Sequence, residues 1–137
     1  MAEEYMPNWS HFSGRRQRVH AAMELLFDYE KSLGSHLVEG LETIDGVTIH
    51  GITAPDAMDR RVPTVSLTHD DLSPDEIAIA MAERNIFVWS GDFYAVELLN
   101  QLGVDDPAAV LRIGPVHYNS TAEIDETLQV LKTIVDR

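Results

Sequence analysis

The sequence predicts an α+β fold: a small, mostly antiparallel sheet of about four strands with helices packed on one face, preceded by a long N-terminal helix. Two features lead to this prediction. A long run with apolar residues every three or four positions is followed by four short strand candidates. Two Ser-x-x-Glu motifs then stand directly before further helical patterns. Strands and helices in this mixture indicate one core between a sheet and its helices.

The long helix is predicted from residue 13 to residue 45, where Asp45 and Gly46 indicate a turn. Gly34 interrupts the helical pattern at a cost of about 1 kcal/mol relative to alanine. Residues 1–12 are predicted to be an irregular tail, and residues 13–137 a single domain. The apolar positions expected on one buried face of the helix are Val19, Met23, Leu26, Leu33, Leu37, Leu41 and Ile44.

The remaining elements follow from short local signals. Capping boxes, formed by Ser73 with Glu76 and by Ser120 with Glu123, predict the starts of two helices. We expect the first to stop at Asn85 and the second to reach residue 135. A short helix is predicted over residues 93–102, and a polar loop over residues 54–61. The predicted strands are residues 47–52, 64–68, 86–89 (broken by Gly91) and 110–113.

Composition excludes several classes of function. The formal net charge is −13, and such a surface repels nucleic-acid backbones. No apolar run reaches the roughly 20 residues of a membrane span, and the acidic N-terminus does not resemble a signal peptide. No cysteine is present, so disulfides and thiolate sites are excluded. We therefore expect a cytoplasmic protein without membrane contact, and we assign no metal to the scattered histidines, having weighed His11 with His20 and His36 with Glu39.

Arg112 is the candidate binding residue. Strand alternation places it on the face opposite Leu111 and Ile113, and its planar fork suits a carboxylate. Two interpretations stay open, an internal salt bridge to Asp92 or Glu123 and the binding of a ligand carboxylate. The segment that follows leads into a helix N-terminus, which favours anions. Its candidate residues are His117, Tyr118 and Asn119.

A second candidate cluster lies between the third strand and the short helix. A glycine crowded by aromatic residues makes a loop that can line a flat ligand, although a small hydrophobic cluster under a loop is the alternative. The residues concerned are Trp89, Gly91, Asp92, Phe93 and Tyr94. The sequence contains no glycine-rich phosphate motif, and its spacing reveals no catalytic triad.

These clusters, in this order, resemble the C-terminal part of the class V aminotransferases. These are pyridoxal phosphate (PLP) enzymes of fold type I, and they include the cysteine desulfurases. Residues 62–135 carry the resemblance, and residues 13–51 resemble the segment that joins the large domain to the small one. The matching runs are Arg61-Val-Pro-Thr-Val-Ser, Ser73-Pro-Asp-Glu-Ile-Ala, Ile86-Phe-Val-Trp-Ser-Gly-Asp-Phe-Tyr-Ala and Leu111-Arg-Ile-Gly-Pro-Val-His-Tyr-Asn-Ser-Thr-Ala-Glu-Ile-Asp.

The resemblance implies a small domain that folds over a PLP site, with Arg112 holding the substrate carboxylate. Tyr94 stands where the desulfurases carry their sulfur-accepting cysteine, so persulfide chemistry at this loop is not expected. PLP enzymes of this type hold the cofactor on a lysine of the large domain. The lysines here are Lys31 and Lys132, both in predicted helices. We therefore assign no catalytic residue and no cofactor to this chain alone, and PLP is implied for a full-length parent.

The expected partners are a large PLP-binding domain or second subunit and an amino-acid carboxylate, and we expect a homo-oligomer. The alternative function is a non-enzymatic α+β interaction or dimerisation module that uses the aromatic N-terminus and the long helix. A third interpretation is an independent small-molecule binding protein.

Overall fold

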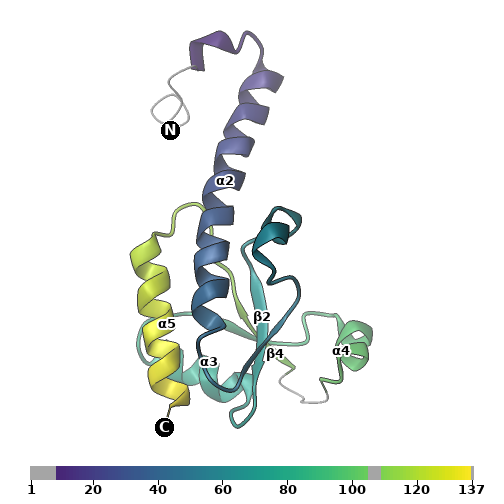
Figure 1. Cartoon of the computed structure of the whole chain (residues 1–137), viewed down its shortest axis with the longest axis vertical. Helices are drawn as coiled ribbons and strands as arrows, with labels where there is room; N and C mark the ends of the chain where they lie inside the picture. Colours follow the sequence, from purple (N-terminus) through teal and green to yellow (C-terminus); the bar gives the residue numbers. More distant parts are fainter. Residues whose placement is uncertain (1–8, 105–108, 137) are drawn as a thin grey trace.

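The computed structural model describes residues 9–104 and 109–136, so the predicted tail lies mostly outside it (Figure 1). It confirms the α+β prediction, with helices packed against a four-stranded sheet. The elements in chain order are the 3-10 helix η1 (Trp9–His11), α2 (Arg15–Leu41), β1 (Val47–His50), the 3-10 helix η2 (Pro55–Arg60), β2 (Val65–His69), α3 (Pro74–Ala82), β3 (Trp89–Gly91), α4 (Val96–Leu102), β4 (Val110–Ile113) and α5 (Thr121–Val135).

The sheet is antiparallel, with strand order β1-β2-β4-β3. Arg112 stands opposite Ser66 on one neighbour and opposite Trp89 on the other. Leu111 stands opposite Leu67 and Ser90. Because side chains alternate along a strand, this register gives the sheet an apolar face and an opposite face that carries Arg112.

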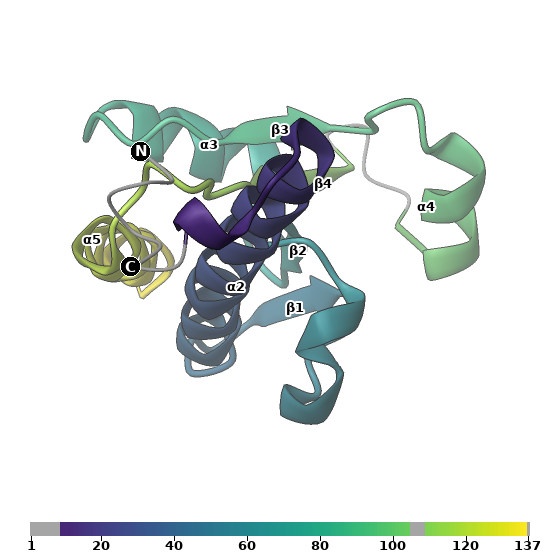
Figure 2. The same ribbon diagram turned by 90° about the horizontal axis from the view of Figure 1, so that it is seen from above.

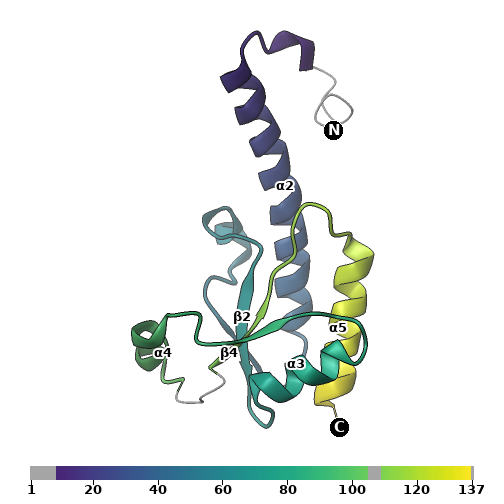
Figure 3. The ribbon, with the colours of Figure 1, turned by 180° about the vertical axis from the view of Figure 1, so that it is seen from behind.

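The core lies between the apolar face of the sheet and three helices. Val65, Leu67, Leu111 and Ile113 from the strands pack in one cluster with side chains of α2, α3 and α5. Helix α5 runs beside the lower part of α2 (Figures 1 and 3), whereas α4 and α5 lie on opposite sides of the molecule (Figure 2). Full burial of a leucine or isoleucine side chain contributes about 1.5–3 kcal/mol. The helical residues of this core are Leu33, Leu37, Val38, Leu41, Ile77, Met81, Ile124, Leu131 and Ile134.

Helix α2 passes through Gly34 without a break, in agreement with one long predicted helix that tolerates this glycine. Gly34 is buried, and a Cβ atom there would lie 3.0 Å from the Cα of Pro63. The glycine is used for close approach of the loop before β2. The helix ends at Leu41 rather than near Asp45, and Gly46 forms the following turn with φ +76°.

The predicted buried face of α2 is buried only over its C-terminal half. Leu33, Leu37 and Leu41 are buried, but Val19 and Met23 are 50% and 58% exposed. Figure 1 shows the reason, because the N-terminal half of α2 projects beyond the sheet and beyond α5. Half of the apolar stripe therefore has no sheet beneath it.

Three local predictions differ in detail from the structure. The third strand starts at Trp89, and Gly91 pairs with Val110 instead of breaking the strand. Residues 55–60 form the 3-10 helix η2 within the segment predicted as a polar loop, and Met58 of this helix is buried against the core. Helix α4 begins only at Val96, after two residues with positive φ.

The predicted helix signals at other termini are confirmed. In both capping boxes the serine hydroxyl accepts a bond from the glutamate backbone, and the glutamate side chain accepts from the serine backbone. Gly103 ends α4 with the left-handed conformation expected of a C-terminal glycine. Asn85, with φ +60°, ends the turn after α3.

No helix within residues 9–104 and 109–136 has the length and apolar character to span a bilayer. The same residues contain no group of three or more histidine or acidic side chains arranged to hold a metal. His36, considered with Glu39, instead lies 2.6 Å from the Asp125 carboxylate of α5.

Candidate functional site

Arg112 lies on the open face of the sheet, and its side chain is exposed. The strand register places Ser66 and Trp89 on either side of it. His50 and Thr68 stand further along β1 and β2, with 3.0 Å between the His50 Nε2 and the Thr68 hydroxyl. Burial lowers the pKa of His50, which keeps that ring neutral near pH 7. Of these neighbouring strand residues, Arg112 therefore carries the positive charge.

The Arg112 guanidinium stacks on Phe93, with 4.8 Å between Cζ and the ring centroid. It forms no ion pair with any described residue. The two carboxylates considered as partners are used elsewhere. Asp92 accepts the Tyr94 N–H, and Glu123 closes its capping box with Ser120. The edge of the guanidinium, where its N–H groups lie, has no anionic partner among the described residues.

The loop after β3 is held in an unusual backbone conformation. Phe93 and Tyr94 both have positive φ, at 52° and 60°. The Asp92 side chain accepts the Tyr94 N–H at 2.9 Å, and its carbonyl accepts the Ala95 N–H at 2.8 Å. Such conformations cost about 1–3 kcal/mol each and concentrate at functional sites. Here they turn Phe93 onto Arg112 and leave Tyr94 fully exposed.

Next to Arg112 is an open cleft of about 460 Å³, which we call the Arg112 cleft. Its walls come from the start of β2, the segment before β3, the loop after β3 and the end of β4. Arg112 is its one charged lining residue among those the structure describes. The other lining residues are Thr64, Phe87, Val88, Trp89, Phe93 and Gly114.

The His117–Asn119 turn is fastened to helix α2 rather than to the Arg112 cleft. Glu30 accepts the His117 backbone N–H at 3.1 Å and lies 3.0 Å from its Nδ1. Tyr29 donates its hydroxyl to the Asn119 carbonyl at 2.7 Å. Tyr118 is exposed and meets the His117 ring edge-on.

A second hollow, of about 230 Å³, adjoins the Arg112 cleft and includes Asn119. The two hollows share Phe87, Val88 and Gly114 as lining residues. The structure thus brings Arg112 together with Trp89 and Phe93, and places Asn119 in the next hollow. His117 and Tyr118 line neither hollow.

The sequence interpretation missed four residues of the cleft: Thr64, Phe87, Val88 and Gly114. For Thr64 a signal existed, because alternation along β2 puts it on the same face as Ser66, and Ser66 pairs with Arg112. Gly114 is close to Thr64, and a Cβ there would lie 3.3 Å from the Thr64 hydroxyl. Phe87 and Val88 lie in the strand predicted over residues 86–89, whereas β3 starts only at Trp89.

Arg61 differs from Arg112 in that its guanidinium is hydrogen-bonded within the protein. Its guanidinium donates to the carbonyls of Ile52 and Thr64, the latter at 3.0 Å, and so joins η2 to β2. Burial lowers the pKa of Arg61. Arg112, by contrast, has an aromatic ring against its face and no protein carbonyl or carboxylate at its edge among the described residues.

Comparison with known proteins identifies the family. Residues 19–127, more than half of the chain, match the family described as aminotransferase class V. The chain belongs to the class V aminotransferase family. The family resemblance inferred from the Arg112 and Trp89–Ala95 motifs is therefore confirmed.

The curated relatives are much longer proteins. The chain is 30% identical over 82% of its length to an aminotransferase-like protein of Gibberella zeae, and covers 28% of that protein. It is 29% identical over 87% of its length to a probable cysteine desulfurase of Staphylococcus epidermidis, again covering 28% of it. The chain thus spans little more than a quarter of these relatives.

Solved structures share the fold. A cysteine desulfurase from Thermococcus onnurineus NA1 superposes with a TM-score of 0.76 and 24% identity, over 88% of this chain and 28% of that one. A NifS-like protein from Rickettsia africae gives a TM-score of 0.69 and 22% identity, over 88% and 32%. The small α+β fold therefore recurs as one part of larger proteins.

The family as a whole uses PLP, but the residues of this chain do not fit an anchoring role for it. PLP enzymes attach the cofactor to a lysine. Lys31 lies on α2, and Lys132 lies on α5 with its Nζ 3.8 Å from the Asp136 carboxylate. Neither lines the Arg112 cleft.

Proposed function

We propose that this chain is the substrate-carboxylate-binding C-terminal domain of a PLP-dependent class V aminotransferase or cysteine desulfurase-like enzyme. Arg112 is the carboxylate clamp. The observation that supports it best is the guanidinium of Arg112, which stacks on Phe93 but has no anionic partner within the described residues. A planar fork in that setting suits two parallel bonds from a carboxylate.

In this proposal the remaining candidate residues belong to two segments near the bound substrate. Trp89, Gly91, Asp92, Phe93 and Tyr94 form the active-site loop. His117, Tyr118 and Asn119 belong to the substrate-binding side, with Asn119 in the hollow that adjoins the Arg112 cleft.

The domain is not catalytically competent alone. PLP is held by a large domain or a second subunit, because neither lysine here lies at the cleft. The absence of cysteine from the sequence also removes sulfur transfer through a thiol of this chain.

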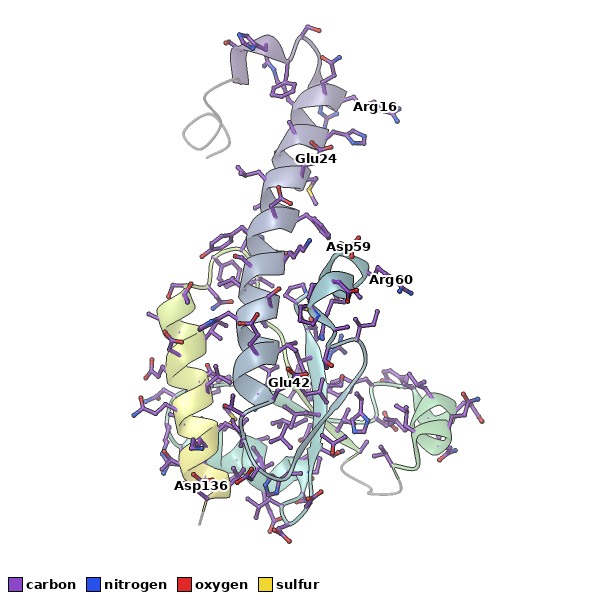
Figure 4. All side chains as sticks on the ribbon, in the orientation of Figure 1. Arg16, Glu24, Glu42, Asp59, Arg60 and Asp136 are labelled. Carbon is purple, nitrogen blue, oxygen red and sulfur yellow. The ribbon has the colours of Figure 1, made fainter. Side chains whose placement is uncertain are left out.

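The test is an NMR titration of the chain with acetate and L-alanine, which follows the Arg112 Nε–Hε resonance in wild type and the backbone amide resonances around the Arg112 cleft in wild type and variants alike. The carboxylates should shift the Arg112 resonance saturably, and Arg112→Gln should weaken binding at least about tenfold, the effect of losing a charge-assisted bond of about 1.5–3 kcal/mol. Arg60→Gln is the control, since Arg60 is exposed on η2 and points away from the body (Figure 4). If Arg112→Gln and Arg60→Gln weaken carboxylate binding equally, or if neither weakens it, the role of Arg112 as the carboxylate clamp is wrong.

A dimerisation module is the second candidate function, favoured by the projecting half of α2. Val19, Met23 and Phe27 repeat every four residues and are all exposed; we call them the α2 stripe. Residues at that spacing lie along one side of a helix. A second copy of the chain can cover this stripe with its own.

Charge on the same half of α2 favours an antiparallel pair. The first turn contains Arg15 and Arg16 and no acidic residue, which is unfavourable beside the positive end of the helix dipole. Glu24 and Asp28 lie further along, and Figure 4 shows Arg16 and Glu24 on the projecting half. Antiparallel pairing brings the basic end of one helix to the acidic part of the other.

Because the chain has no cysteine, Met23→Cys supplies a unique thiol at the centre of the α2 stripe. Oxidation should link two copies through it much faster than through Glu24→Cys, which lies about 100° around the helix. Sedimentation should show a dimer that Met23→Glu dissociates. A monomer at all concentrations, or equal cross-linking of both cysteine variants, would rule out this pairing.

A further inference from the structure

The Arg112 cleft has one charged residue at its edge and aromatic walls beside it. Phe87 and Trp89 are 82% and 74% exposed, and the Phe93 ring covers the guanidinium. We propose that this cleft selects carboxylates with a flat apolar body, such as aromatic amino acids, over small or dianionic ones. The inference rests on the proposed role of Arg112 and adds the substrate class to it.

The two exposed aromatic rings lie beside the Arg112 guanidinium. Trp89 stands directly opposite Arg112 in the sheet register, so its side chain rises from the sheet next to the guanidinium. Phe87 lines the same cleft two residues earlier. A carboxylate at the Arg112 edge therefore leaves the body of its molecule beside two aromatic surfaces that water otherwise covers. Burial of such surface favours an apolar ligand.

The Arg112 cleft has few polar side chains that could bind a second charge. Beyond Arg112, the side chain of Thr64 is the one hydrogen-bonding group among the side chains in its wall, apart from the indole of Trp89. A ligand with a second charge would lose water without gaining an ionic partner. The adjoining hollow contains Glu123 and Glu126, which repel a second carboxylate. Dianionic ligands are disfavoured on both sides.

Tyr94 lies outside the Arg112 cleft. It belongs to the same loop but is fully exposed and does not line the cleft. The asparagine side chains nearby, Asn85 and Asn119, line the adjoining hollow instead. Selectivity should therefore depend on Phe87 and Trp89.

The experiment compares four ligands by NMR titration of the chain: acetate, succinate, 3-phenylpropionate and 3-phenylpropanamide. The aromatic acid should bind at least tenfold more tightly than acetate, and succinate no more tightly than acetate. Arg112→Gln should bring the aromatic acid to the level of its uncharged amide. Phe87→Ala and Trp89→Ala should each reduce the ratio of aromatic-acid to acetate affinity at least threefold. Ile79→Ala, which removes an exposed apolar side chain on α3, should not change that ratio.

The outcomes separate this inference from the carboxylate role. If acetate binding depends on Arg112 but the phenyl group adds nothing, the clamp stands and the aromatic selectivity is wrong. If succinate binds as tightly as 3-phenylpropionate, the selectivity is also wrong. If no acid binds in a way that depends on Arg112, the clamp itself is wrong. Unchanged ratios in both aromatic variants would overturn the assignment of selectivity to these rings, and amide peak positions at distant residues report whether each variant remains folded.

Discussion

The ring of Phe93 lies over the guanidinium of Arg112, with 4.8 Å between the ring centroid and Cζ. Phe93 reaches this place through a left-handed backbone conformation, and the next residue is held by the Asp92 side chain. The ring covers one face of the flat cation and leaves its edge open. Arg112 is thereby fixed in orientation without the loss of its hydrogen-bonding fork.

Replacement of Phe93 should weaken the clamp without removing its charge. Phe93→Leu keeps a Cβ at the same positive φ but loses the cation–π contact, worth about 0.5–1 kcal/mol at an exposed site. Acetate affinity should fall two- to fivefold, and the Arg112 Nε–Hε resonance should move toward the position of a free arginine. Phe93→Tyr should restore both. A Phe93→Leu variant with unchanged affinity and resonance would contradict the positioning role.

The capping box of α5 should make the free energy of unfolding depend on pH. Hydrogen bonds from the Ser120 backbone, then its hydroxyl, lower the pKa of Glu123 below its ordinary value of 4.5. A depressed folded-state pKa stabilises the fold above the unfolded-state value, and this contribution is lost as pH falls through the folded-state pKa. In urea titrations between pH 6 and pH 3, wild type should lose stability more steeply than Glu123→Gln. Glu126→Gln is the control outside the capping box, and its free energy of unfolding should fall with pH as in wild type. If the free energy of unfolding of Glu123→Gln falls as steeply as that of wild type, the linkage to Glu123 is wrong.

Gly34→Ala should destabilise the protein although alanine is the better helix former. Helix propensity alone predicts a gain of about 1 kcal/mol. The new methyl group, however, would lie 3.0 Å from the Cα of Pro63, and backbone cannot rotate away as a side chain can. Strain of about 1–3 kcal/mol should exceed the gain, giving a lower urea midpoint. Glu39→Ala, at an exposed position on the same helix, should not lower it; a higher midpoint for Gly34→Ala would show that Pro63 shifts easily.

Added PLP should not modify one lysine selectively. Lys132 sits beside Asp136 on α5, and Lys31 lies on α2, so neither has the cleft around it. Borohydride reduction followed by mass spectrometry should find low and comparable labelling at both lysines and the N-terminus. Saturable one-to-one labelling of Lys31 or Lys132 would contradict the view that the cofactor belongs to another domain.

Local signals in the sequence predicted the local structure well. Both capping boxes, the glycine at the end of α4 and the alternation in β2 and β4 act between residues a few positions apart, so they are visible in one chain. Arg112 was placed on the correct side of the sheet for the same reason. The aromatic composition of the loop at Phe93 also indicated a candidate site.

Contacts between distant segments could not be predicted in this way. The tie between Glu30 and His117, and the approach of Gly34 to Pro63, depend on how α2 crosses the sheet. The position of Phe93 over Arg112 depends on two successive positive φ angles, and no glycine announces them. The helical periodicity of α2 was right, but it cannot tell where the supporting sheet ends.

The bonds from Tyr29 and Glu30 to the 117–119 turn make α2 a lever with its pivot next to the strand that carries Arg112. From Arg15 to Glu30 the arm is about 22 Å long, so a tilt of about 10° moves its tip by about 4 Å. We expect a partner that holds the tip fixed to limit this tilt. We expect a displacement of a few ångströms at the tip to move the residues beside the 117–119 turn by much less, because α2 is held there by the bonds from Tyr29 and Glu30.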